Sequence, residues 1–135
     1  MKRQKTNWTC GPYAISNALM AIGVKSSVRD LIKVCGTRKK TGTDEFQIEK
    51  GLKHLGFQAK MRAFKSFAEF KKTKKFVTPA ICCVDNYSHW VVLLGLINKR
   101  YIILDSIRGL QSYTEDQWKK RWQAKDGLYF AITFL

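Results

Sequence analysis

The 135-residue sequence predicts an α+β fold, because helical patterns fill its first half and strand patterns its second. Apolar residues recur at helical spacing through residues 11–22, 27–36 and 43–55. After residue 79 the chain changes to β-branched and aromatic runs separated by turn dipeptides such as Asp85-Asn86 and Asn98-Lys99. We therefore expect N-terminal helices packed against a C-terminal antiparallel β-sheet.

The predicted helices carry start and stop signals. Pro12 suits the first turn of the first helix, where a missing N–H is harmless, and Gly23 follows its last apolar position. Ser27 and Asp30 have the spacing of a capping box at the start of the second helix, which Gly36 ends. These signals place a helix start at or just after Cys10.

Strand patterns account for most of the remaining chain. Alternating apolar residues predict a first strand over 57–63, and a short helix opens at Ser66. A helix over 114–123 precedes the last strand. The later strands are expected over Ala80–Val84, His89–Ile97, 101–107 and 128–134.

Composition favours one globular domain over residues 1–135. The chain is 45% hydrophobic, with two prolines and no linker-like run. Its basic N-terminus lacks the apolar stretch of a secretory signal, and the longest apolar run, 90–97, is far shorter than the ~20 residues of a spanning helix. We expect no transmembrane segment and a cytoplasmic location.

The chain is strongly basic, with 25 Lys and Arg against 10 Asp and Glu and a net charge of +15. This charge favours an acidic protein partner, another polyanion or an anionic membrane surface. The basic residues Arg38, Lys39, Lys40 and the run 71–75 either form an ordinary solvated surface or a polyanion-binding face. No nucleic-acid-binding motif occurs, although a nucleic-acid partner stays open.

Four cysteines occur without the spacing of a metal site, so we expect no metal and no cofactor. Cys35, Cys82 and Cys83 are predicted to be buried packing thiols. Cys10 differs, because a helix N-terminus stabilises a thiolate through its dipole and free N–H groups. We interpret Cys10 as a nucleophile.

A nucleophilic thiol needs a base and a group that orients the base. His54 lies in a polar part of a predicted helix, whereas His89 opens an apolar strand. The hairpin through Asn98-Lys99 should bring Asp105, at the end of the next strand, beside His89, where it can hold the imidazole tautomer. Asp85 and Asn86, close to His89 in sequence, are alternative orienting groups.

Gln4 lies six residues before Cys10. A side-chain amide at this position can donate to an oxyanion beside the backbone N–H of Cys10. Removing one such donor typically costs about 2.7–4 kcal/mol of transition-state stabilisation.

These segments resemble a known family. QKTNWTCGPYAISNAL resembles the start of papain-like cysteine peptidases, above all the bacteriocin-processing (double-glycine leader) peptidases and their stand-alone relatives. HWVVLLG and YIILDS are similar to that family's His and Asp strands, and TGTDEFQIEKGLKHLGF to its middle helix. The resemblance implies a papain-like fold, with Gln4 as oxyanion donor, Cys10 as nucleophile, His89 as general base and Asp105 as orienting residue.

The leading hypothesis is a cysteine peptidase that hydrolyses a peptide or protein substrate through an acyl-enzyme, with a leader peptide as one candidate. Thr9 and Ser106 depart from residues frequent beside the Cys and the Asp in the family. Papain-like folds also host deamidases, acyltransferases and toxin effectors, which could act on an acidic protein. A non-catalytic basic binding module is the third hypothesis.

Overall fold

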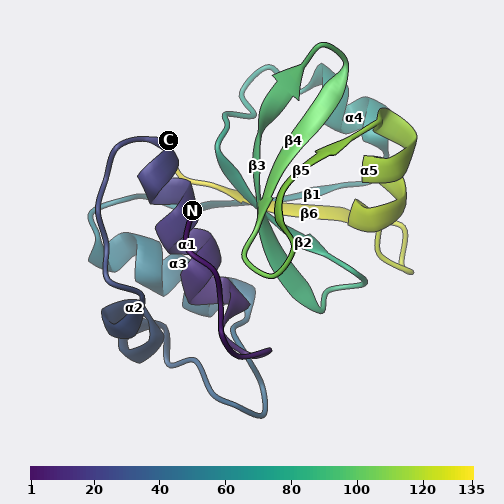
Figure 1. Ribbon diagram of the computed structural model, residues 1–135. Coiled ribbons are helices and arrows are strands. Elements are labelled where there is room, and N and C mark those ends of the chain that lie inside the picture. The colour runs from purple at the N-terminus through teal and green to yellow at the C-terminus, as the bar shows by residue number, and fades with distance from the viewer.

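The computed structural model describes residues 1–135 and contains five helices and one six-stranded antiparallel sheet (Figure 1). The helices are α1 (Cys10–Ala21), α2 (Val28–Cys35), α3 (Glu45–His54), α4 (Phe67–Lys72) and α5 (Glu115–Trp122). The strands are β1 (Lys60–Phe64), β2 (Ala80–Val84), β3 (His89–Ile97), β4 (Arg100–Asp105), β5 (Gly109–Tyr113) and β6 (Tyr129–Thr133). None of the helices combines the length and the apolar character needed to cross a membrane.

The strand order is β1-β6-β2-β3-β4-β5, so the last strand in sequence lies inside the sheet, between β1 and β2. Helices α1, α2 and α3 lie on one side of the sheet, and α4 and α5 lie on the other (Figure 1). The predicted α+β architecture is confirmed, with the addition that short helices also cover the second face.

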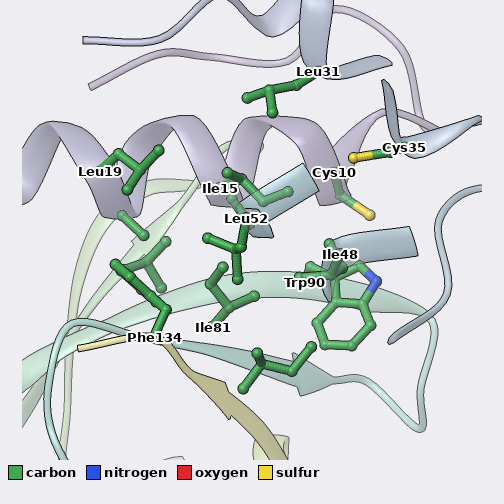
Figure 2. Close-up of a cluster of buried hydrophobic side chains, with 14 of the residues drawn as sticks. Cys10, Ile15, Leu19, Leu31, Cys35, Ile48, Leu52, Ile81, Trp90 and Phe134 are labelled. Atoms are coloured by element: carbon green, nitrogen blue, oxygen red, sulfur yellow. The ribbon is translucent and has the colours of Figure 1, made fainter. Parts of the chain in front are cut away.

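Each face of the sheet has its own hydrophobic core. Figure 2 shows the first, where α1, α2 and α3 pack Ile15, Leu19 and Leu52 against Ile81 of the sheet. The second is aromatic: Trp118 and Trp122 of α5 are fully buried and stack with ring centroids 5.2 Å apart. Burial of large apolar side chains contributes about 1.5–3 kcal/mol each, so α1 and α5 are both firmly held on the sheet.

The helix starts follow the predicted capping pattern. Ser27 accepts a hydrogen bond from the N–H of Asp30 at 3.3 Å, and Ser66 caps α4 in the same way. Thr114 and Gln117 form a reciprocal capping box at the start of α5. The third helix begins at Glu45 rather than at residue 43, because Asp44 is its N-cap.

One strand was missed by the sequence prediction. β4 ends at Asp105, two residues before the predicted end, and the chain turns back at once into β5. Gly109 adopts φ +92°, which allows this tight return. β5 is an edge strand whose large apolar residue Leu110 is 65% exposed, so its sequence shows no clear buried face.

The β3–β4 hairpin has a different register from the predicted one. A bulge between Leu93 and Gly95 shifts the ladder, and Val92 lies opposite Leu104. Continuing that register places Asp105 opposite Val91, which lies two residues after His89 in β3. The two side chains therefore meet diagonally across the strands rather than directly opposite each other.

Candidate active site

Cys10 is the first residue of α1 and is 6% exposed. The N-cap residue, Thr9, makes no capping hydrogen bond to α1, because its hydroxyl lies 2.8 Å from that of Thr6. Pro12 has no N–H, so the backbone donors at this helix start are those of Cys10 and Gly11. An uncapped helix start with no acidic residue in its first turn favours a negative charge on the sulfur or on a bound oxyanion.

His89 begins β3 and is 8% exposed. Its Nε2 lies 3.0 Å from Oδ1 of Asp105. Because Nε2 is engaged by the carboxylate, Nδ1 is the nitrogen left for the thiol of Cys10. Burial alone would lower the pKa of His89, but hydrogen bonds with Asp105 and with Cys10 outweigh it and raise that pKa to about 9.

Asp105, at the end of β4, is fully buried and surrounded by donors. Besides His89, its Oδ1 accepts from the backbone N–H groups of Ile107 at 2.8 Å and Arg108 at 3.2 Å, and its Oδ2 accepts from Arg121 at 2.7 Å. Burial opposes ionisation, yet these donors hold the pKa of Asp105 well below its usual range. The carboxylate is therefore ionised when it holds the imidazole.

Arg121 is the site residue that the sequence analysis missed. It reaches from α5, with a side chain only 8% exposed, and binds Asp85 through two nitrogens at 3.1 and 3.2 Å as well as Asp105. Its NH1 donates to the Tyr113 hydroxyl at 3.0 Å. A detectable signal existed: Arg121 lies three residues after Trp118, on the side of an amphipathic helix that faces the core.

Asp85, one of the two alternative orienting groups, pairs with Arg121 and not with His89. Asn86 accepts from the N–H of Lys125 at 3.0 Å. Both lie in the turn that leads into His89, and both fix this turn to the end of α5 and the loop after it. Asp105, and neither of these two residues, is therefore the hydrogen-bond partner of the imidazole.

Gln4 lies against the residue that follows Asp105. Its N–H donates to the Ser106 carbonyl at 3.0 Å, and the Ser106 hydroxyl donates to its side-chain carbonyl. Its side-chain nitrogen donates to the Thr6 carbonyl at 2.6 Å. The structure thus brings together Cys10, His89 and Asp105, and places Gln4 at the adjoining N-terminal segment.

Two adjoining hollows meet near Cys10. The first, of about 270 Å³, is lined by Cys10, Trp8, Trp90 and the loop 39–43. The second, of about 440 Å³, shares Trp90 and Thr43 with the first and continues to Asp44 and Glu45. Figure 2 shows the Cys10 sulfur pointing toward the Trp90 indole, which lies between α1 and the sheet.

The other three thiols are buried, as predicted. Burial raises the pKa of Cys35 to about 11 and that of Cys83 to about 12, and raises that of Cys82 well above its ordinary value. These thiols are poor nucleophiles at neutral pH. No group of three or more His, Cys, Asp or Glu side chains is arranged to hold a metal ion.

Sequence comparison decides the family. Residues 1–130 match the peptidase C39 family. The chain belongs to the peptidase C39 family. It is accordingly a cysteine peptidase, and the peptidase hypothesis is favoured over the binding module. No curated protein sequence matches the chain.

Solved structures of this family share the fold. The peptidase domain of Streptococcus ComA, a bifunctional ABC transporter of a quorum-sensing pathway, is 24% identical with a TM-score of 0.78, covering 98% of this chain and 95% of that domain. A double glycine motif protease from an AMS/PCAT transporter, solved with its leader peptide, is 20% identical with a TM-score of 0.83, covering 98% and 87%. The C39-like domain of a Vibrio parahaemolyticus toxin secretion protein is 15% identical, with a TM-score of 0.66 and coverage of 98% and 99%. The predicted papain-like fold is confirmed.

Proposed function

We propose that this C39 peptidase cleaves leader peptides after a double glycine, with Cys10 as nucleophile, His89 as general base and Asp105 as the residue that orients His89. The observation that carries the proposal is the 3.0 Å contact between His89 Nε2 and Asp105 Oδ1, which turns Nδ1 toward a thiol at an uncapped helix start. Nucleophile, base and orienting group are the three parts that thiol catalysis requires.

The reaction proceeds in two acyl-transfer steps. His89 Nδ1 first takes the thiol proton, and the resulting Cys10 thiolate, paired with the imidazolium, attacks the scissile carbonyl carbon and forms the C–S bond. The tetrahedral intermediate collapses, the C–N bond breaks, and the imidazolium returns its proton to the leaving amine. A water molecule, deprotonated by His89, then attacks the thioester and releases the carboxylate product and the free thiol.

The oxyanion of the intermediate needs donors close to Cys10. The backbone N–H of Cys10 is one, because α1 starts there without a side-chain cap. We assign the second to Gln4. Its amide nitrogen carries two hydrogens, so one can stay on the Thr6 carbonyl while the other donates to the oxyanion.

The double glycine follows from the tightness of the hollow. Cys10 is 6% exposed, and the bulky Trp8 and Trp90 line the same small hollow, so we infer that substrate side chains are poorly accommodated at the attacked carbonyl. Glycine lets a backbone approach such a site closely. The AMS/PCAT relative, described as a double glycine motif protease bound to its leader peptide, supports the same substrate class for this chain.

A fluorogenic peptide that carries Gly-Gly before the scissile bond tests the proposal. We expect Cys10→Ala and His89→Ala to abolish turnover, and Gln4→Ala to reduce kcat by about 10²–10³. His54→Ala is the matched control, since His54 is exposed on α3 and should leave turnover unchanged. Turnover that survives Cys10→Ala, or that is unaffected when both glycines are replaced by valine, would contradict the proposal.

A further inference from the structure

The loop 37–43 crosses next to Cys10 and is held rigidly. The Thr37 and Thr43 hydroxyls lie 2.6 Å apart in a buried hydrogen bond, and Arg38 pairs with Gly42 as an isolated antiparallel bridge. This loop is therefore a small closed hairpin rather than a loose connection between α2 and α3.

The base of this loop is fixed to the site itself. Trp90 donates its indole N–H to the Thr43 carbonyl at 2.8 Å. A Cβ added at Gly11 would lie only 2.6 Å from the Thr43 Cβ, so the loop touches the backbone beside Cys10 directly. The tip of the loop consequently keeps a fixed position over the thiol.

That tip carries Lys39 and Lys40, and both line the hollow that contains Cys10. Both are exposed, and neither takes part in any of the four ion pairs of the structure. No Asp or Glu lines this hollow. Two unpaired ammonium groups therefore face the space through which a substrate reaches the sulfur.

The positive charge is concentrated at this hollow and does not simply reflect the net charge of +15 of the whole chain. The adjoining hollow, which shares Thr43 and Trp90, is lined instead by Asp44 and Glu45 and by no Lys or Arg. A peptide lying across both hollows thus meets opposite charges at the two ends. Such a field discriminates between substrates by sign, because a like charge is repelled as well as an opposite one attracted.

We propose that Lys39 and Lys40 form a specificity subsite that selects peptides with an Asp or Glu side chain directly beside the double glycine. The two lysines line the same small hollow as Cys10, and an extended peptide advances only about 3.3 Å per residue, so the residues next to the glycines are the ones that pass them. The inference rests on the proposed function and deepens it by naming the substrate charge.

Small alkylating reagents test the subsite without any peptide. Iodoacetate and iodoacetamide differ in charge, and the ratio of their rates at Cys10 reports the local field. We expect Lys39→Glu/Lys40→Glu to lower the ratio of the iodoacetate rate to the iodoacetamide rate by about tenfold, because two cations beside the thiol become anions, and the effect to shrink in high salt. Lys74→Glu/Lys75→Glu changes the same net charge at two exposed, adjacent positions and should leave the ratio within twofold.

Paired peptides complete the test. Two Gly-Gly peptides differ only by Glu or Lys beside the glycines, and the wild type should cleave the Glu peptide faster by kcat/KM, with the order reversed in Lys39→Glu/Lys40→Glu. Lys39→Gln/Lys40→Gln, which avoids new acidic contacts, should cleave both equally. A shifted alkylation ratio without cleavage of either peptide would sink the double-glycine substrate but retain the basic subsite. Normal cleavage with no charge preference and an unchanged alkylation ratio would overturn the subsite alone.

Discussion

Arg121→Met removes the guanidinium group that donates to Oδ2 of Asp105. The Arg121 side chain is 8% exposed and bridges Asp85 and Asp105, so the variant leaves a fully buried carboxylate with His89 as its only ionic partner. Breaking a buried pair by removing one partner costs about 3–5 kcal/mol. We expect the lower end, about 3 kcal/mol, because Asp105 keeps His89 and two backbone N–H donors.

This loss has a thermal equivalent. Unfolding entropy of about 2.1 cal/mol/K per residue over 135 residues converts about 3 kcal/mol into a Tm lower by about 10 °C. Urea unfolding and calorimetry measure the two quantities. Arg100→Met is the matched control, because Arg100 is exposed and bonds only Ser112, so its stability should stay within about 0.5 kcal/mol of wild type.

The same variant separates positioning from bulk stability. Asp105 has a depressed pKa, so its contribution to stability is present above the ordinary Asp pKa and is lost as pH falls through the folded value. Without Arg121 the folded pKa of Asp105 should rise toward its ordinary value, so the loss should be smaller and end at a higher pH, and kcat should fall with little change in KM, partly rescued by Arg121→Lys. An unfolding free energy within about 1 kcal/mol of wild type, together with an unchanged acid limb, would refute the reasoning.

Four further predictions concern the site. Asp105→Asn should lower kcat by about 10³–10⁴, because an amide favours the wrong imidazole tautomer, and a loss below tenfold in peptide hydrolysis would contradict this. Hydrolysis should decline as pH rises through about 9, where the imidazolium of His89 no longer supplies a proton to the leaving amine; a decline complete by pH 7 would be inconsistent with the raised pKa. The same raised pKa predicts that His89 stabilises the fold fully below pH 6.5 and loses that contribution through pH 9, which urea titrations at pH 6, 8 and 10 can show. Gly11→Ala should destabilise by about 1–3 kcal/mol despite the better helix propensity of alanine, because its methyl group would meet Thr43, and equal or higher urea stability would exclude that clash.

Much of the fold could be predicted because local chemistry determines it. The Ser27 and Ser66 caps form as their spacing suggests, and β2 and β3 have the predicted bounds. β5 escaped prediction because its exposed face carries the apolar Leu110 while its more buried face carries Gly109 and Gln111, so the apolar pattern does not follow burial. The hairpin register failed because the two-residue turn at Asn98-Lys99 pairs Ile97 with Arg100, which places Asp105 near Val92, and the bulge before Gly95 moves it only one residue closer to His89.

The candidate site divides in the same way. Cys10 and His89 are marked by their positions at a helix start and a strand start, which the sequence shows directly. Arg121 comes from an element that joins the site only after α5 packs on the second face of the sheet, so its role depends on tertiary structure. The acidic or polyanionic partner and the cytoplasmic location stay predictions.

The account depends most on Cys10 being the one activated thiol. Limiting iodoacetamide at neutral pH, followed by mass spectrometry of each cysteine peptide and by the Gly-Gly cleavage assay, measures this directly. We predict that Cys10 is alkylated far faster than Cys35, Cys82 and Cys83, and that cleavage is lost in proportion to Cys10 modified. Cleavage that persists after complete alkylation of Cys10, or Cys10 reacting no faster than Cys35, would contradict the account.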